Sequence, residues 1–291
     1  MARQRKRTKR RHGFAYFVLL LLALIIWSFW GNTALTRTDI TFASARVPME
    51  LDGLVIAHIS DLHDANLGND NSDIVEMVAK ARPDIIVLTG DMIDSNRLTI
   101  ERTLSLAERL VAIAPVYYAN GNHEAALSNN DYHRLTRGLR DAGVEVLEDR
   151  SVVVSWHNAS FQIVGLNDPG FTPGTNAEKF DALENSLLLL TRNDMFTLVL
   201  AHRPEFIGRY SACNPELVLS GHAHGGQIRL PLIGGLYAPG QGAFPKYDAG
   251  LYTKGKTSMI VSRGIGNSSA PLRINNRPEI VIITLKSEGH P

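Results

Sequence analysis

Seven residues that commonly bind divalent metals are spread along the chain, in clusters that each follow a short apolar run. The clusters are Asp61-Leu62-His63, Gly90-Asp91, Gly121-Asn122-His123-Glu124, His202, and Gly221-His222-Ala223-His224. Strands that end in ligand-bearing loops bring distant residues together at one edge of an α/β sheet. Carboxylates, one amide oxygen and imidazoles suit two divalent cations such as Mn, Fe or Zn. Paired ions of this kind act in displacement at phosphorus, so these residues predict a metal-dependent phosphoesterase.

The spacing of residues within the clusters also suits a metal-binding site. Asp61 and His63 lie two residues apart, so in an extended segment both side chains leave the same face. The glycines before Asp91, Asn122 and His222 permit tight turns that aim the next side chain outward. Each cluster alone is more often a turn or a surface histidine. Because all of them follow apolar runs in a fixed order, we interpret them as one site.

The elements that must position these clusters alternate in α/β fashion. The pattern predicts strands over 54–59, 85–89, 116–119, 152–156, 161–166, 198–201, 217–219, 228–230, 258–261 and 280–285. It predicts helices over 72–81, 99–111, 131–142 and 177–192. Residues 231–255 form a long loop rich in glycine, proline and aromatic side chains. Both halves supply metal-binding clusters, so we expect one globular unit with two facing sheets and helices outside.

Charge and cysteine content exclude several classes of protein. Residues 1–12 carry seven Lys or Arg and no acid, which leaves 23 bases against 29 acids, a net charge of −6, in residues 13–291. That acidic body is unsuited to general nucleic-acid binding, which depends on neutralising phosphates. The single Cys213 excludes an internal disulfide and a thiolate cluster. No obligate protein partner is evident.

The basic N-terminus precedes residues 14–30, which carry no charge. Their length and flanking tryptophans predict an uncleaved transmembrane helix, with a cleaved signal peptide as the alternative. Positive charges stay on the cytoplasmic side, so we expect a single-pass cell-membrane protein whose catalytic domain is extracytoplasmic. The expected organisation is a basic cytoplasmic tail, 1–13, the anchor, 14–30, a connector with the first strand, 31–53, and a catalytic domain, 54–291.

The clusters resemble the motifs of the calcineurin-like metallophosphoesterase family, over about Leu54 to Leu285. Residues 200–204, 220–231 and 262–280 further resemble its bacterial membrane-associated branch, which includes the YkuE- and YaeI-type phosphodiesterases. The resemblance implies an α/β fold of four layers, an αββα sandwich in which two mixed β-sheets are flanked by helices.

The resemblance also implies seven metal ligands, in two sets that share one bridging carboxylate. The sets are Asp61, His63 and His224 for one ion and Asn122, His202 and His222 for the other, with Asp91 bridging both. The expected cofactors are two divalent ions of Mn, Fe or Zn, whose identity stays open. A hydroxide that bridges them is the expected nucleophile, because coordination lowers the pKa of water.

Two further residues are expected to act in catalysis. His123 would protonate the leaving oxygen as a general acid, and Asp94 would orient its imidazole. Arg203 and Arg273 are candidates for contact with substrate phosphate, with a structural salt bridge as the equal alternative. Ser95 stands where the protein-phosphatase branch has an arginine, which argues against phosphoprotein substrates.

The predicted activity is hydrolysis of a phosphodiester or phosphomonoester of a small molecule or lipid. The expected anchor suggests lipid-linked or envelope phosphates as substrates. One alternative is a pyrophosphohydrolase that acts on a nucleotide-linked lipid. Another is a non-catalytic scaffold that keeps the fold, which the complete set of ligand positions disfavours.

Overall fold

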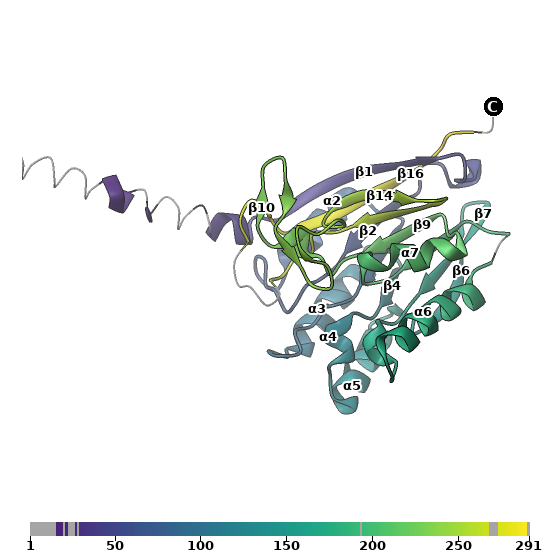
Figure 1. Ribbon diagram of the computed structural model, residues 1–291, viewed down its shortest axis with the longest axis horizontal. Helices are drawn as coiled ribbons and strands as arrows, with labels where there is room; N and C mark the ends of the chain where they lie inside the picture. Colours follow the sequence, from purple (N-terminus) through teal and green to yellow (C-terminus); the bar gives the residue numbers. More distant parts are fainter. Residues whose placement is uncertain are drawn as a thin grey trace, which may run out of the picture.

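Two six-stranded mixed sheets pack face to face, with helices on their outer faces (Figure 1). The computed structural model describes residues 16–19, 21–22, 27, 29–192, 194–267 and 273–289. The predicted α/β class with two mixed sheets and helices is confirmed.

The first sheet has the strand order β1-β16-β2-β3-β4-β5. Its strands are β1 (Thr36–Ser44), β16 (Glu279–Ser287), β2 (Val55–Ile59), β3 (Ile85–Thr89), β4 (Val116–Ala119) and β5 (Glu145–Val146). β2, β3, β4 and β5 are mutually parallel, whereas β16 runs antiparallel to β2 and parallel to β1. Parallel pairing of β2, β3 and β4 brings the loops that follow them to one edge of the sheet.

The second sheet has the order β14-β15-β9-β8-β7-β6. Its strands are β14 (Gly250–Lys254), β15 (Thr257–Val261), β9 (Leu217–Ser220), β8 (Thr197–Leu200), β7 (Ala159–Gly165) and β6 (Arg150–Trp156). The four central strands are parallel, and the two outer strands are antiparallel to their neighbours. The loops after β8 and β9 therefore also meet at one edge.

Three apolar layers hold this arrangement together. The middle layer lies between the sheets, where Ile56 and Val87 of the first sheet pack near Leu198 and Leu219 of the second. The first sheet is covered outside by α2 (Ser72–Ala81), α3 (Ile100–Val111) and α5 (Asn129–Asp141), and the second by α6 (Asn176–Leu190) and α7 (Ile207–Tyr210). Helix α3 illustrates how the helices attach to the sheets. Its buried residues Leu106 and Leu110 recur at helical spacing, so they lie on one face of the helix, and that face packs against the sheet.

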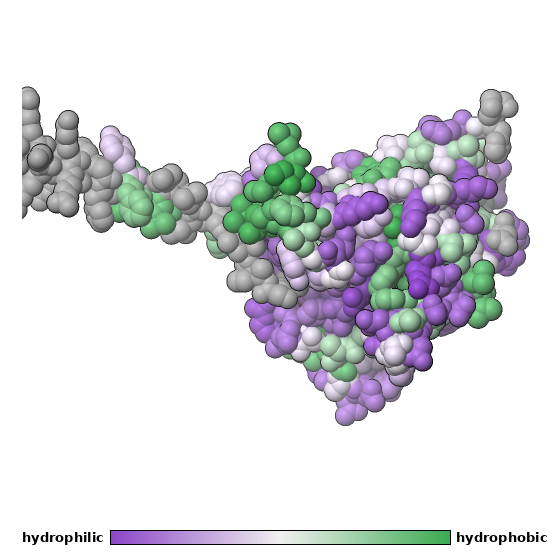
Figure 2. Space-filling view, viewed as in Figure 1, coloured by the Kyte–Doolittle hydropathy of each residue, from purple (hydrophilic) through white to green (hydrophobic). Residues whose placement is uncertain are grey.

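The expected long loop forms two short antiparallel ribbons. They pair β10 (Arg229–Leu230) with β11 (Gly234–Gly235) and β12 (Tyr237–Ala238) with β13 (Gly242–Ala243). Figure 2 shows a hydrophobic prominence near β10. The large apolar side chains exposed in this part of the chain are Leu230, Leu232, Ile233, Tyr237 and Phe244.

The prediction for the N-terminal segment requires correction. Among the described residues, no helix combines the length and the apolar character needed to cross a membrane. On this finding the predicted transmembrane helix and the single-pass, extracytoplasmic localisation are wrong. The expected tail, 1–13, and part of the expected anchor lie outside the described residues.

Candidate metal centre

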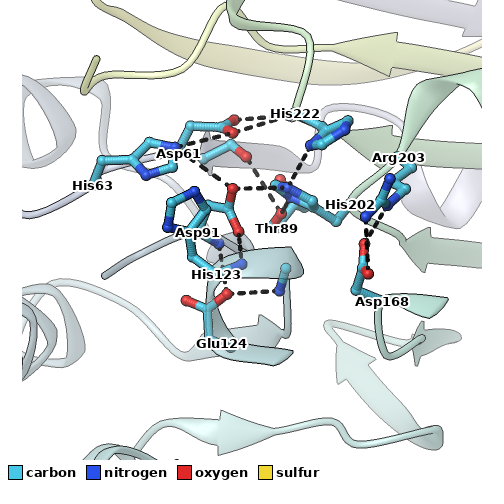
Figure 3. A network of polar contacts seen from close by, with 12 residues as sticks. Asp61, His63, Thr89, Asp91, His123, Glu124, Asp168, His202, Arg203 and His222 are labelled. Carbon is cyan, nitrogen blue, oxygen red and sulfur yellow. Dashed lines mark hydrogen bonds and ion pairs between the residues drawn. The ribbon is translucent and has the colours of Figure 1, made fainter. Parts of the chain in front are cut away.

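The predicted ligands follow the carboxyl ends of five strands. Asp61 and His63 follow β2, Asp91 follows β3, Asn122 begins the short helix α4 (Asn122–Ala125) after β4, His202 follows β8, and His222 and His224 follow β9. The two sheet edges face each other, so the loops from both halves meet in one buried cluster (Figure 3).

The backbone of these loops differs from the sequence-based expectation. Asp61 and His63 have φ angles of 51° and 45°, and Asp91 has 52°, so these residues are left-handed and not extended. Non-glycine residues adopt this conformation at a cost and persist in it only when surrounding contacts fix them. The Asp61 and His63 side chains both reach the cluster, as expected. They do so from a left-handed backbone and not because they leave the same face of an extended segment.

We call Asp61, His63 and His224 the Asp61 group. One ligand atom from each lies within 4.8 Å of the others, and all three residues are buried. The Nε2 atoms of His63 and His224 are 3.2 Å apart, and His224 Nε2 is 3.4 Å from Asp61 Oδ1. Both carboxylate oxygens of Asp61 also accept the backbone N–H of His222 at 3.0 Å. The two halves of the chain are thus tied together within the site.

We call His202, His222 and Asn122 the His202 group. His222 Nδ1 lies 3.2 Å from His202 Nε2, which lies 3.2 Å from Asp91 Oδ2. His202 Nδ1 donates to the carbonyl oxygen of Thr89 at 2.7 Å, so Nε2 is the nitrogen left for a ligand. The Oδ1 of Asn122 is buried and has no hydrogen-bond partner among the described residues.

Asp91 lies between the two groups. Its Oδ1 accepts the backbone N–H of His123 at 2.8 Å, while its Oδ2 lies 3.5 Å from His63 Nε2 and 3.2 Å from His202 Nε2. One carboxylate oxygen therefore faces ligand atoms of both groups. This is the geometry of a bridging ligand.

The charges of the cluster fit divalent cations at three of its four histidines, whereas the carboxylate of Asp91 overcomes burial and raises the pKa of the fourth, His202, to about 10. Burial lowers the pKa of His63 to about 4 and the pKa values of His222 and His224 well below their usual range, so these imidazoles are neutral at pH 7 and available as ligands. Burial, together with the neighbouring Asp91, raises the pKa of Asp61 to about 6. Ring nitrogens and carboxylate oxygens lie opposite one another in this cluster, and each neutral imidazole presents one nitrogen lone pair. Cations between them would satisfy these atoms.

Gly221 lies where the loops after β2 and β9 approach each other closely. A Cβ atom at Gly221 would lie 1.9 Å from Ser60 Oγ and 2.2 Å from Asp61 Oδ2. No side chain fits there while the β9 loop remains against the β2 loop. Gly221 therefore matters through this contact between the halves, in addition to any effect on the turn before His222.

Glu124 braces the loops after β3 and β4. Its carboxylate accepts backbone N–H groups of Gly121 at 2.8 Å, Asp91 at 2.9 Å and Met92 at 2.8 Å. This buried carboxylate holds Asp91 beside Asn122 and makes no contact typical of a chemical role. The three-residue spacing from Gly121 to Glu124 is that of a capping box, which is the sequence signal for such a brace.

His123 lies at the mouth of the site, with 15% of its side chain exposed. Its Nδ1 accepts the backbone N–H of Ser95 at 3.1 Å and lies 3.1 Å from the Ser95 hydroxyl. Asp94 Oδ1 is farther away, at 3.6 Å from the same nitrogen. Ser95, which the sequence did not single out as a partner of His123, is thus its closest contact, and orientation by Asp94 stays a prediction.

The two candidate arginines differ in their surroundings. Arg203 forms a two-pronged pair with Asp168, from Nε to Oδ2 at 2.5 Å and from Nη2 to Oδ1 at 3.2 Å. Arg273 is 1% exposed, and its guanidinium donates to the carbonyl of Arg263 and lies 3.4 Å from His224 Nδ1. In this geometry Arg203 has a structural partner and Arg273 backs a predicted ligand. A substrate contact by either stays a prediction.

Comparison with known proteins identifies relatives over most of the chain. Residues 54–226 match the family described as calcineurin-like phosphoesterase. The uncharacterized metallophosphoesterase YkoQ of Bacillus subtilis is 30% identical over 275 residues, which cover 91% of this chain and 98% of the relative. Phosphodiesterase YaeI of Escherichia coli is 31% identical over 215 residues, 74% of either chain. The uncharacterized metallophosphoesterase YkuE of B. subtilis is 31% identical over 263 residues, 86% of this chain and 85% of the relative.

Proposed function

Because this chain belongs to the calcineurin-like phosphoesterase family, we propose that it hydrolyses phosphodiesters at a centre for two divalent ions. That it is a metal-dependent phosphoesterase follows from the family and from relatives such as the phosphodiesterase YaeI. The observation that carries the proposed centre is the position of Asp91 Oδ2 between His63 and His202.

The proposed ligands are the Asp61 group for one ion and the His202 group for the other, with Asp91 shared. Ions bound there supply Lewis acidity to phosphoryl oxygens and lower the pKa of water. The chain's own contribution is to keep three imidazoles neutral by burial and to fix two carboxylates by backbone N–H groups. Both devices hold the ligand atoms in place before substrate arrives.

His123 is the proposed general acid. Since its Nδ1 accepts the backbone N–H of Ser95, the neutral ring carries its proton on Nε2. The ring packs edge-on against His63, with centroids 4.5 Å apart, so it borders the proposed metal site. A proton donor in this position suits departure of an alkoxide or phenoxide.

One narrower expectation loses its support. The lipid-linked or envelope substrates relied on the predicted anchor, and no helix among the described residues is long and apolar enough to cross a membrane. The pyrophosphohydrolase of a nucleotide-linked lipid did not depend on that location and stays an untested alternative. The non-catalytic scaffold is disfavoured because six of the seven predicted ligands lie in groups that could hold a metal ion and the relatives include a phosphodiesterase.

The proposal is tested on chelated protein reconstituted separately with Mn²⁺, Fe²⁺ and Zn²⁺. We expect about two ions per chain by elemental analysis and turnover of bis(p-nitrophenyl) phosphate faster than p-nitrophenyl phosphate. One ion per chain, or faster hydrolysis of the monoester, would overturn the two-metal diesterase assignment. The proportion of each metal bound from a mixture identifies the preferred pair.

A further inference from the structure

A second feature adjoins the metal centre. A cavity of about 290 Å³ lies between the loops after β2 and β3 and residues 265–267. One wall is His63 of the Asp61 group, so the cavity borders the proposed centre. Its volume is at the lower end of small-molecule sites, which occupy roughly 300–1,000 Å³.

The side chains around this cavity give it a cationic rim. Arg97 and Arg102 both line it, and Asp64 is the one acid among its described lining residues. The Asp64 carboxylate is turned to the backbone, where Oδ2 accepts the N–H groups of Thr99 at 3.0 Å and Asp94 at 3.4 Å. Among the described residues, neither guanidinium forms a direct ion pair with the Asp64 carboxylate, because Arg102 binds the backbone carbonyl of Asp64 and Arg97 binds Asp94.

Both arginines keep unused donors. Arg97 uses Nε and Nη2 on Asp94 Oδ2, both at 3.2 Å, which leaves Nη1 without an acceptor among the described residues. Arg102 donates from Nη1 to the carbonyl oxygen of Asp64 at 2.5 Å. Its Nη2 and Nε have no hydrogen-bond acceptor within the part of the chain that the structure describes. The Arg97 side chain is 75% exposed. Forked guanidinium donors of this kind suit carboxylate or phosphate oxygens.

We propose that this cavity binds a second anionic group of the substrate, and that Arg97 and Arg102 recognise it. The inference rests on the proposed function, because the scissile phosphate would occupy the centre beside His63 while the second group enters the cavity. The substrate class is then a phosphate ester with a carboxylate or a further phosphate on one side of the scissile bond. A plain dialkyl phosphate would offer no acceptor to the unused donors, Arg97 Nη1 and Arg102 Nε and Nη2.

Three small ligands that share one phosphonate test the proposal. Propylphosphonate ends in a methyl group, 3-phosphonopropionate in a carboxylate and propane-1,3-diphosphonate in a second phosphonate. Their inhibition constants are measured against bis(p-nitrophenyl) phosphate, and their binding to the metal-loaded protein is measured by titration calorimetry. The wild type is expected to bind at least one of the two ligands that carry a second anionic group about tenfold more tightly than propylphosphonate.

Two variants test whether Arg97 and Arg102 cause the preference for a second anionic group. Arg97→Ala should abolish most of the tenfold preference with little change in the binding of propylphosphonate, and Arg102→Ala should act in the same direction. Arg134→Ala is the matched control, since Arg134 lies on α5 and pairs with Glu101, away from the cavity. Arg97 is exposed, so its variant is expected to fold, and circular dichroism checks this.

The outcomes separate the inference from the function on which it rests. An equal preference in wild type and Arg97→Ala, or none in wild type, overturns the second-anion site even if diesters are hydrolysed, and leaves Arg97 as a partner of Asp94 only. Loss of the preference in Arg97→Ala by calorimetry supports the site. The same calorimetric result in a protein without esterase activity supports the site and overturns the proposed function. The carboxylate and phosphonate ligands show which anion the cavity prefers.

Discussion

The two ligand groups share Asp91 but are backed by groups of opposite polarity. Behind His202 lies the carbonyl oxygen of Thr89, which accepts the Nδ1 proton at 2.7 Å. Behind His224 lies the guanidinium of Arg273, with Nη2 3.4 Å from Nδ1. An acceptor behind an imidazole makes it a stronger ligand, whereas a cation makes it a weaker one. The two proposed metal sites are therefore expected to differ in affinity.

This inequality has a physical origin in the two halves of the chain. The His202 group uses strand ends alone, since Thr89 is the last residue of β3 and His202 follows β8. The Asp61 group also depends on Arg273, which is held by carbonyl oxygens of the loop at 263–266. We therefore expect the His202 group to bind its ion more tightly. Substitutions of Asp91, His123, Asp61 and Glu279 test this difference between the two groups.

The largest effect is expected for Asp91→Asn, which removes the charge shared by both groups. Elemental analysis should show loss of at least one ion, and diester turnover should fall by roughly 10³-fold or more, because both sites lose the carboxylate that they share. Asp39→Asn, at an exposed carboxylate paired with Arg37, serves as the control. Full metal content with unchanged turnover would remove Asp91 as the bridge.

His123→Ala tests chemistry apart from metal binding. The variant should keep its metal content while kcat for esters with poor leaving groups falls roughly 10²–10⁴-fold. The deficit should shrink for p-nitrophenolate, which needs no proton to depart. His133→Ala, at an exposed residue of α5, is the control. Loss of metal in His123→Ala would make this histidine a ligand.

Metal removal compares the two groups directly. A chelator titrated into the wild-type protein should remove the ions in two steps, with midpoints about tenfold apart. Asp61→Asn should abolish the first step and preserve the second, since it weakens the group backed by Arg273. If Asp61→Asn abolished the later step, the order of the two sites would be reversed.

The smallest effect is expected for Glu279→Gln. Glu279 accepts the backbone N–H of Arg263 at 2.9 Å, its guanidinium at 2.7 Å and the hydroxyl of Thr38 at 2.5 Å. Although burial opposes ionisation, these partners hold the pKa of Glu279 below its usual 4.5. The stability from this lowered pKa is therefore present above pH 4.5 and is lost as pH falls below it.

We expect Glu279→Gln to lower the free energy of unfolding by about 1–2 kcal/mol at pH 7, measured by urea denaturation. The difference from wild type should narrow below pH 4.5. Because Arg263 supplies a carbonyl to Arg273, the variant should also bring the two chelator midpoints closer together. A stability difference that does not change with pH would mean that packing, and not charge, explains the loss.

Much of the scaffold could be predicted because apolar runs and helical spacing are local properties. The expected helix at 72–81 and strands at 85–89 and 116–119 coincide with α2, β3 and β4. Parallel pairing then places their following loops at one edge. The convergence of the metal-binding clusters depends only on this arrangement, which explains why their order along the chain was informative.

Other features depend on contacts that spacing does not encode. The left-handed backbone of Asp61 and His63 is fixed by loops from both halves, and no local pattern announces it. Ser95 reaches His123 because the β3 and β4 loops meet, and Arg273 is buried by the fold around it. The N-terminal prediction is contradicted within the described residues, where no helix is long and apolar enough to cross a membrane.

The pairing of β1 with β16 has a consequence for synthesis on the ribosome. β16 lies between β1 and β2, so the last strand of the chain completes the middle of a sheet begun by the first. Until Glu279–Ser287 leaves the exit tunnel, β2 presents an unpaired edge, which is prone to association with other chains. We expect a chain that stops before Glu279 to aggregate or be degraded, even though every proposed metal ligand has already been translated.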